Sequence, residues 1–360
     1  MNRRSKINLV SISLSLFSTI LIFFLLLLII GKDPIEIFSL IYTDVFTSGY
    51  GIGQTLFKAT PLIICGCGLA VCFHASLFNI GAEGQLNAGS FVIALIALKL
   101  SFLPFPLLLL ICFICGFIVS GIFGLIPAYI KVKKDVSEVI TTIMFNFIII
   151  ALVNFFLVDF FAVKSTMRTE KIPDDDMLFK LSDYFPVFSG SSLNAAFLIA
   201  LIISLLTYIF IYKTKIGYKL RAVGFNETAS KYIGIKTDKI ILFAFFLGAG
   251  ITSLTGINFV FGYKGFYELG FSNNVGFTAI AVALLAKNNP IGIIFSSLLF
   301  AVMDYGGLSI NQLVPKEIML VVQGVIILAI LSTDRLVNNC HHKEISSCVG
   351  KRKLSRQSSC

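Results

Sequence analysis

The chain has 360 residues, of which 57% are apolar, with a mean hydropathy of +0.92 and a formal net charge of +10. Soluble globular domains contain only about 45–50% apolar residues, so this composition excludes a soluble protein and predicts a polytopic membrane protein. The positive charges lie mostly between apolar blocks, which favours a membrane topology signal over a nucleic-acid interface.

Unbroken apolar blocks predict that the membrane-spanning elements are helices. A membrane-spanning strand alternates apolar and polar residues, whereas residues 21–30 are apolar without interruption. The apolar content suffices for about ten helices of about 20 residues, the length that crosses about 30 Å of hydrocarbon. We therefore predict an all-α polytopic fold with about ten transmembrane helices, over residues 9–30, 55–78, 86–101, 104–128, 139–162, 194–212, 240–262, 276–286, 291–306 and 318–333.

The first span follows a basic start within the first six residues. Its apolar run, residues 9–30, is too long for the apolar part of a signal peptide and lacks a small-residue cleavage site, so we predict an uncleaved span. Three later spans, which start at Leu86, Gly276 and Ile291, are short for a full crossing. We expect these three to be broken or re-entrant helices.

Between the second and third spans, the apolar pattern is interrupted by FNIGAEGQ at residues 78–85. Gly81 and Gly84 permit close backbone approach, and the carboxylate of Glu83 near hydrocarbon should face a partner, water or headgroups. The segment is therefore either part of a substrate path or a loop at the headgroups. The candidate substrate-path residues, six neutral polar residues and this carboxylate, are Asn79, Glu83, Gln85, Asn87, Thr142, Asn146 and Gln323.

The fifth predicted span carries a polar stripe. Thr142, Asn146 and Asn154 lie along one slowly drifting face of a helix. Such a stripe faces protein or water, so either hydrogen bonding between helices or the lining of a pore would explain it. The following segment, residues 163–193, contains an acidic run at 174–176 and is predicted to be the longest external loop.

Residues 213–239 form a charged segment that we place in the cytoplasm. The pattern predicts a helix, a break at Gly224, and a second short helix capped by Asn226 and ended by Gly234. A compact, charged helical hairpin outside the membrane is a candidate docking surface. A solvated loop with no partner is the alternative interpretation.

The charge distribution also predicts the orientation. With the amino terminus in the cytoplasm, the cytoplasmic side collects more than half of the 29 Lys and Arg residues. An even number of spans places the carboxyl terminus on the same side. We therefore expect a transmembrane domain over residues 1–333 and a basic cytoplasmic tail over residues 334–360, whose Ser, Lys and Arg content predicts disorder.

Two segments resemble each other within the chain. Asn87-Ala-Gly89 and Asn274-Val-Gly276 each precede an apolar run, and in this topology they enter the membrane from opposite sides. This pattern predicts an inverted repeat of spans two to five against spans seven to ten, with the substrate path at their interface. Chance similarity between apolar segments is the alternative.

The sequence lacks the motifs of nucleotide and metal sites. No Gly-x-x-x-x-Gly-Lys-[Ser/Thr] loop occurs, so ATP, if it drives this protein, is bound by a separate subunit. The eight cysteines show no Cys-x-x-Cys spacing that is matched by a second such pair, which predicts buried free thiols and no metal site. His341 and His342 beside the tail cysteines are a weak pattern for a metal.

Three segments together resemble a known family: FNIGAEGQLNAG at 78–89, KLRAVGFNETASKYIGI at 219–235 and GFTAIAVALLAKNNPIG at 276–292. In this order and spacing they resemble the permease subunits of bacterial ABC importers for nucleosides and simple sugars, the ribose-type permeases. The first segment most resembles the nucleoside branch. The likeness covers nearly the whole chain and is weakest before Gln54 and after Thr333.

The resemblance implies a ten-helix fold with related halves, similar to that of cobalamin-importer permeases, without enzymatic activity or a cofactor of its own. It also implies a second permease subunit, identical or different, two cytoplasmic ATP-binding subunits, and an external substrate-binding protein or lipoprotein. The expected location is the bacterial inner membrane. The residues that would couple to the ATP-binding subunits are Arg221, Gly224, Asn226, Glu227 and Gly234.

We therefore predict a permease that moves nucleosides across the inner membrane by alternating access. The alternatives are a simple-sugar permease, an ion-coupled secondary transporter, and a membrane scaffold or channel. A secondary transporter should show paired ionisable residues near the midplane. Besides Glu83, only Lys58, Lys99, Asp159 and Asp304 come near, and most of these lie at predicted span ends.

Overall fold

The computed structural model describes residues 21–25, 27–315, 317–325 and 328. The chain divides into two units, Asp44–Tyr305 and a smaller one made of Met1–Thr43 with Gly306–Cys360. Among the described residues all named elements are helical, and extended pairing is limited to the isolated bridges Arg168–Glu268 and Lys180–Asn194. The prediction of an all-helical fold is therefore confirmed for this part of the chain.

Six helical spans are long and apolar enough to cross a membrane: Gly49–His74, Phe105–Lys134, Glu138–Phe161, Ala196–Lys213, Thr237–Lys264 and Pro290–Ser309. Two further helices, α4 (Ala82–Lys99) and α13 (Val275–Leu285), are more polar or shorter. The chain is thus a multi-pass membrane protein with about six to eight membrane-length apolar helices in its described part. The predicted first span lies mostly outside these residues, the predicted last span lies partly outside them, and the predicted tail lies wholly outside them.

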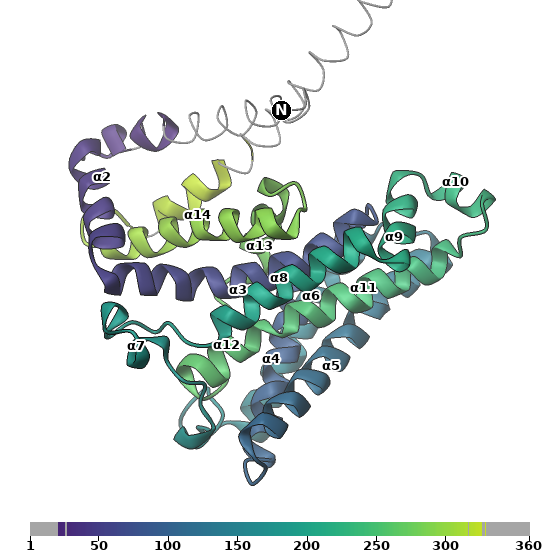
Figure 1. The fold of residues 1–360 in the computed structure, drawn as a ribbon, viewed down its shortest axis with the longest axis horizontal. Coiled ribbons are helices and arrows are strands. Elements are labelled where there is room, and N and C mark those ends of the chain that lie inside the picture. The colour runs from purple at the N-terminus through teal and green to yellow at the C-terminus, as the bar shows by residue number, and fades with distance from the viewer. Residues whose placement is uncertain (1–20, 26, 316, 326–327, 329–360) are drawn as a thin grey trace, which may run out of the picture. The chain divides into compact units, whose positions relative to one another are not determined.

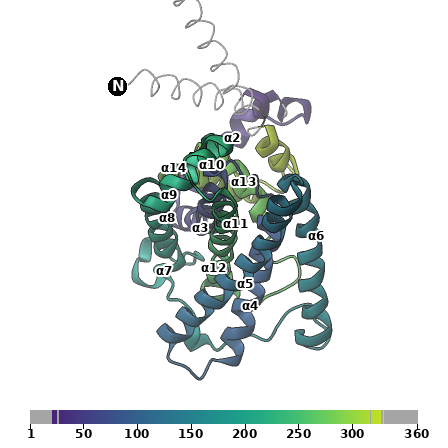
Figure 2. The same ribbon diagram turned by 90° about the vertical axis from the view of Figure 1, so that its right-hand side faces the viewer.

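In the larger unit, α3 (Gly49–His74) and α11 (Thr237–Ser253) lie at the centre. Both are mostly buried, whereas α5 (Phe105–Lys134), α6 (Glu138–Phe156) and α8 (Ala196–Lys213) bury only one side. The helix α11 packs against α3 and α5, and α4 packs against α5 and α6 (Figures 1 and 2). The outer helices can therefore present their exposed apolar faces to lipid.

Small residues allow the two central helices to approach closely. A Cβ on Gly68 of α3 would lie 2.8 Å from the Thr252 methyl carbon, and one on Gly248 of α11 would lie 2.6 Å from the Cys72 sulfur. Helix pairs in membranes associate through such small-residue contacts because lipid provides no hydrophobic driving force. Four of the cysteines are buried free thiols, as predicted: Cys65, Cys67, Cys72 and Cys112.

Several span boundaries differ from the prediction. The second span begins earlier, at Gly49, and the third begins at Ala82 rather than Leu86. Of the three spans expected to be short, only α13 is short, with 11 residues. The other two, α4 and α14 (Pro290–Ser309), have 18 and 20 residues. The predicted span over 240–262 corresponds to the helical span Thr237–Lys264, in which α11 is followed by α12 (Thr255–Phe259) and the π-helical turn η5 (Val260–Lys264).

The loop over residues 163–193, which the sequence predicts to be external, packs onto the segment that follows α12. It contains the short elements η3 (Asp174–Asp176), α7 (Leu181–Tyr184) and η4 (Pro186–Phe188). Its amides at Thr169, Ile172 and Leu178 donate hydrogen bonds to the carbonyls of Tyr267, Gly265 and Phe261, respectively, over 2.8–2.9 Å. The loop is therefore held against residues 261–267.

The smaller unit contains an element that the sequence analysis did not predict. The helix α2 (Pro34–Tyr42) begins after Asp33, whose carboxylate accepts a hydrogen bond from the Ile35 amide over 2.9 Å. Its last turn lies close to Gly306, where a Cβ would come 2.8 Å from an Ile41 methyl carbon. The π-helical turn η1 (Thr43–Thr47) follows and leads toward α3.

Candidate functional site

The amino terminus of α4 is capped by side chains of α6. Its own N-cap residue, Gly81, provides no side-chain hydrogen bond. Instead, the Gly84 amide donates to Asn146 Oδ1, and the Ile80 amide donates to Thr142 Oγ1 over 3.2 Å. Since the first amides of a helix have no partner within that helix, the polar stripe of α6 satisfies groups that would otherwise be unpaired in the interior.

Asn79 and Gln85 close the break between α3 and α4. Their side-chain amides exchange two hydrogen bonds, over 2.8 Å and 3.2 Å, and Asn79 Oδ1 also accepts from the Gly81 amide over 3.2 Å. Ser120 of α5 donates to the Gln85 carbonyl over 2.9 Å and to the Ala249 carbonyl over 2.7 Å. The segment is thus a folded, hydrogen-bonded connection whose polar side chains are buried in the protein.

Glu83 joins the amino termini of two helices. It lies in the first turn of α4 and is only 3% exposed. Its carboxylate accepts hydrogen bonds from Ser272 Oγ and from the amide of Gly276, the second residue of α13, over 2.6 Å in the latter case. Helix amino termini carry partial positive charge, so both favour a carboxylate here. A Cβ on Gly276 would lie 2.6 Å from Glu83 Cα, so this approach requires glycine.

Asn87 extends these contacts to Tyr267 and, through it, to the loop over residues 163–193. Its Nδ2 donates to Ser272 Oγ over 2.9 Å and to the Glu83 carbonyl over 2.7 Å, and its Oδ1 accepts from the Tyr267 hydroxyl over 2.8 Å. The Tyr267 amide donates to Thr169 Oγ1 of the external loop over 3.0 Å. We call the following set the polar network: Asn79, Glu83, Gln85, Asn87, Thr142, Asn146, Tyr267 and Ser272.

The charged segment over residues 213–239 forms the predicted pair of helices. α9 (Lys215–Phe225) is followed by α10 (Glu227–Tyr232), and Asn226 Oδ1 caps α10 by accepting from the Ala229 amide over 2.9 Å. Gly234 ends the hairpin with a φ of +84°, a conformation that favours glycine. Glu227 hydrogen-bonds Lys231 over 2.8 Å and thereby raises the pKa of that amine. We call α9, α10 and the residues up to Lys239 the cytoplasmic hairpin, after the side of the membrane on which the sequence predicts it (Figure 1).

Gly224 does not break the hairpin, in contrast to the prediction. It lies inside α9, and the chain turns at Asn226 instead. The Gly224 carbonyl accepts from Ser76 Oγ over 2.6 Å, and a Cβ on Gly224 would lie 3.0 Å from the Ala75 carbonyl carbon. Glycine is therefore required for close packing of α9 against the end of α3.

Arg221 also faces the transmembrane body. Its guanidinium carbon lies 5.3 Å from the ring centre of Tyr212, near the end of α8. The most exposed apolar side chains of the hairpin are instead Phe225, Tyr232 and Ile233, at 89%, 88% and 69%. Phe225 was recognised from the sequence only as part of the family motif, and Tyr232 and Ile233 were not singled out. The sequence pattern that could have identified these three residues is an apolar side chain next to a helix cap, Asn226, or next to a helix-terminating glycine, Gly234.

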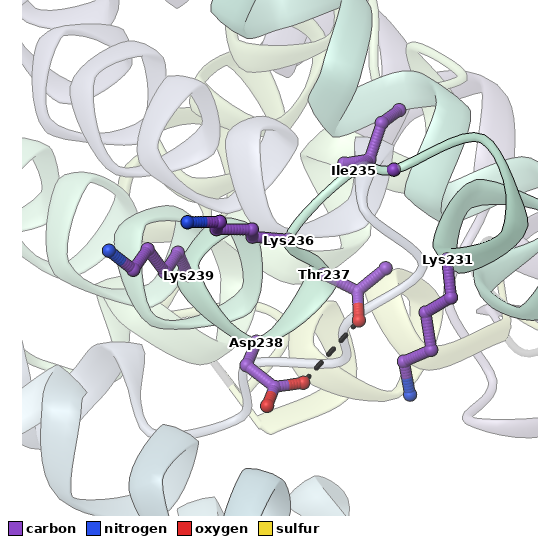
Figure 3. Close-up of a pocket in the computed structure, with 7 residues that line it drawn as sticks. Lys231, Ile235, Lys236, Thr237, Asp238 and Lys239 are labelled. Atoms are coloured by element: carbon purple, nitrogen blue, oxygen red, sulfur yellow. Dashed lines mark hydrogen bonds between the residues drawn. The ribbon is translucent and has the colours of Figure 1, made fainter.

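An open hollow of about 470 Å³ lies between the end of α10 and the start of α11. Figure 3 shows the Lys236 and Lys239 side chains extending in one direction, and Lys231 lying apart from them. Thr237 donates a hydrogen bond to Asp238 over 3.4 Å at this rim. The lining residues are Lys231, Gly234, Ile235, Lys236, Thr237, Asp238 and Lys239.

Comparison with known proteins identifies the family. Residues 51–331 match the family described as "Branched-chain amino acid transport system / permease component". The chain belongs to this permease family. The resemblance seen in the sequence is therefore confirmed, as is the prediction of a non-enzymatic ABC transporter permease, because this family has no catalytic activity of its own.

Three curated relatives align with most of this permease. The nucleoside ABC transporter permease protein NupB of Lactococcus lactis subsp. cremoris is 32% identical, over 84% of this chain and 85% of the relative. The guanosine ABC transporter permease protein NupP of Bacillus subtilis is 30% identical, over 86% and 89%. The glucose ABC transporter permease protein TsgB13 of Haloferax volcanii is 30% identical, over 86% and 83%.

Among solved structures, PsaBC from Streptococcus pneumoniae in complex with Fab is similar over 80% of this chain and 90% of that chain. The TM-score is 0.43 and the sequence identity 15%, so this likeness does not establish a shared fold.

The structure brings together six of the seven candidate path residues of the permease. Asn79, Glu83, Gln85, Asn87, Thr142 and Asn146 are all buried and hydrogen-bonded within the polar network. Gln323 belongs to the smaller unit, where it is a mostly buried residue of the helical stretch 317–325. Their role in transport stays a prediction. Ser272 and Tyr267 were missed because no local signal pairs them with residues more than 170 positions earlier.

Proposed function

We propose that this permease moves nucleosides inward across the bacterial inner membrane, as the membrane-spanning subunit of an ABC importer. The observation that carries the proposal is the meeting of two helix amino termini, those of α4 and the short α13, at the buried Glu83. Transporters bind substrate where discontinuous helices meet in the protein interior. The nucleoside and guanosine permeases among the relatives, each matched over more than four fifths of the chain, support the substrate class.

The polar network has the chemistry that a nucleoside requires. Nucleosides are uncharged and rich in donors and acceptors, so amides and hydroxyls suit them better than fixed charge. Here these groups bond to one another and to backbone groups, as in the Asn79–Gln85 pair and the Asn87–Tyr267 bond. We propose that these polar groups line a substrate path that is closed in this conformation. Separation of α4 from α13 during alternating access would release them to the substrate.

The proposed architecture has ten spans, both termini in the cytoplasm, a transmembrane domain over residues 1–333 and a basic tail over residues 334–360. Spans two to five and seven to ten would form the inverted repeat, which fits α4 and α13 as its two interrupted helices. However, the correspondence between the Asn87 and Asn274 segments that the sequence suggested needs correction. Asn87 lies in the second turn of α4, whereas Asn274 precedes α13, so the two asparagines are not equivalent positions.

We further propose that the permease works as a pair of like or related subunits. Two ATP-binding subunits would dock on the cytoplasmic hairpin, with Arg221, Gly224, Asn226, Glu227 and Gly234 shaping it. Phe225, Tyr232 and Ile233 would make the contact, because exposed aromatic side chains often anchor protein interfaces. An external binding protein or lipoprotein would deliver substrate on the side of residues 163–193. ATP would be bound by the partner, and the permease would hold no cofactor.

A simple-sugar substrate is the second candidate, and the glucose permease among the relatives favours it. An ion-coupled mechanism has less support at Glu83. Its carboxylate already bonds Ser272 and the Gly276 amide, as expected for a group that holds two helices together.

The substrate is tested by uptake in cells that carry the complete importer. Labelled adenosine, guanosine, uridine, ribose and galactose should be compared, each challenged with an excess of the others. We expect nucleoside uptake that other nucleosides inhibit by more than about tenfold, as for a shared site. Sugar uptake that no nucleoside inhibits would overturn the nucleoside assignment and leave the permease assignment intact.

Docking is tested at the two exposed aromatic residues of the hairpin. Phe225→Ala with Tyr232→Ala should weaken co-purification of the ATP-binding subunit at least tenfold, because interface aromatics often contribute about 2 kcal/mol or more each. Tyr184→Ala is the control. Tyr184 is, like Tyr232, an exposed tyrosine, with 70% of its surface accessible, but it lies on the external loop. Undiminished co-purification of the double variant would remove docking from this surface.

A further inference from the structure

A Lys–Asp ion pair lies within two membrane-spanning helices. Lys58 of α3 and Asp304 of α14 are 246 positions apart in the sequence, and the ammonium hydrogen-bonds the carboxylate. Lys58 lies about 13 Å along α3 from its first residue, and Asp304 about 8 Å from the end of α14, at about 1.5 Å per residue. Both residues were expected near the ends of their predicted spans, and the structure corrects this for both.

The pair is not sealed inside the protein. The side chains of Lys58 and Asp304 are 22% and 30% exposed. A charged group that faces lipid at membrane depth costs several kcal/mol, so an exposed ion pair there faces water or another polar surface. In contrast, the ion pairs Lys131–Glu138 and Lys264–Glu268 lie at helix ends, where water and headgroups are near. The position of Lys58 and Asp304 therefore indicates a wetted face within the membrane.

This face has further polar and aromatic groups. Gln54 lies one turn before Lys58 on the same side of α3 and is half-buried, with its Nε2 3.5 Å from Ser192 Oγ. Tyr305 follows Asp304, and its ring centre lies 6.5 Å from that of Tyr50. Aromatic rings beside amide and charged groups are the usual lining of sites for polar organic ligands.

The pair retains hydrogen-bonding capacity. A lysine ammonium has three donors and a carboxylate has about four acceptor positions, whereas the bond between Lys58 and Asp304 uses one of each. The pair carries no net charge, so it can bond to a neutral ligand without leaving a charge uncompensated. Two adjacent hydroxyls match it well, because both can donate to one carboxylate while one accepts from the ammonium.

We propose that Lys58 and Asp304 bind the vicinal diol of the transported molecule as it passes along this face. This inference rests on the proposed import function and adds the substrate feature that the permease itself recognises. The ligand class is a neutral molecule with adjacent hydroxyls, which a ribonucleoside and a simple sugar share. The two hydroxyls hydrogen-bond Asp304, and Lys58 donates to one hydroxyl oxygen, so no covalent step is involved.

The test compares ligands with and without the diol in the complete importer. Wild type and the neutral variant Lys58→Gln with Asp304→Asn are assayed for uptake of uridine and of 2′,3′-dideoxyuridine. Because the binding protein is the same in both, any change in the ratio of the two rates belongs to the permease. We expect the variant to lose at least tenfold in uridine uptake and to change little with the dideoxy compound, so that the ratio collapses.

A purely structural ion pair gives a different result. If the pair only joined α3 to α14, the neutral variant would transport with the wild-type ratio of the two compounds, and this would overturn the proposal. The exchanged variant Lys58→Asp with Asp304→Lys keeps both charges and shows whether the ion pair is needed for folding. Uptake is normalised to the amount of permease that co-purifies with its ATP-binding subunit. If neither variant accumulates in the membrane, the ion pair is required for folding, and this result would also overturn the diol proposal.

The matched control is Lys264→Gln with Glu268→Gln, an ion pair of similar exposure, 29% and 32%, in the same unit. This control variant should keep the wild-type ratio of uridine uptake to 2′,3′-dideoxyuridine uptake. If the wild-type importer takes up sugars and not nucleosides, methyl galactoside and methyl 3-deoxygalactoside, which has no two adjacent hydroxyls, replace the two compounds, so that the nucleoside assignment fails and the diol proposal is still tested. Active wild-type transport with an unchanged ratio in the neutral variant overturns the diol proposal alone.

Discussion

A permease in which Glu83 is replaced by leucine should be recovered from the membrane at less than about a tenth of the wild-type amount. The replacement leaves the Ser272 hydroxyl and the Gly276 amide without their acceptor in a site that is almost closed to water. Each buried polar group left unpaired costs about 1–3 kcal/mol, and the total is comparable to the margin of stability of many proteins. Immunoblots of membranes and size-exclusion profiles in detergent measure the loss.

The glutamine variant separates a structural carboxylate from a proton carrier. Glu83→Gln keeps the shape and one acceptor oxygen, so we expect near-normal amounts of folded permease and partial uptake. If Glu83 carried a coupling proton, this variant would lose uphill uptake but retain exchange of substrate across the membrane. Ser272→Ala is the matched control, because it removes one donor to Glu83 and leaves the Gly276 bond. Normal accumulation of Glu83→Leu would show that the carboxylate does not hold α4 and α13 together.

Local chemistry made the cytoplasmic hairpin predictable. The Asn226 cap and the Gly234 terminus each depend on a few adjacent residues, and both occur as expected. The same logic could have found α2, because Asp33 followed by Pro34 is a strong helix-start signal. Gly224 was misinterpreted because a glycine in a helix can mark either a break or a close contact, and only the packing partner distinguishes them.

The candidate site depended on contacts between distant parts of the chain. The sequence indicated that Glu83 needed a partner, but the donors are 189 and 193 positions away. The start of α4 was placed too late because its first turn is polar, and α6 side chains, rather than a local cap, satisfy its amides. The Lys58–Asp304 pair was discounted for a similar reason, since helix ends estimated from hydropathy misplaced both residues.

Replacement of Gly224 by alanine should reduce uptake at least tenfold while the permease still inserts in the membrane. A Cβ at this position meets the His74 and Ala75 backbone, which cannot move as a flexible side chain would. The Ser76 hydroxyl bonds the Gly224 carbonyl, and Asn79, three residues further on, belongs to the polar network. The hairpin is thus connected to the network through only a few residues.

This short connection predicts that Gly224→Ala uncouples the partner rather than releasing it. Phe225 and Tyr232 point into solvent and stay available, so the ATP-binding subunit should still co-purify. A movement of the hairpin would no longer reach the end of α3, because the tight contact at His74 and Ala75 is forced apart. Substrate uptake and ATP hydrolysis stimulated by the loaded binding protein should therefore fall together in reconstituted complexes. Thr228→Ala, at an exposed position of α10, should leave both unchanged. Wild-type uptake by Gly224→Ala would show that transport does not depend on this contact.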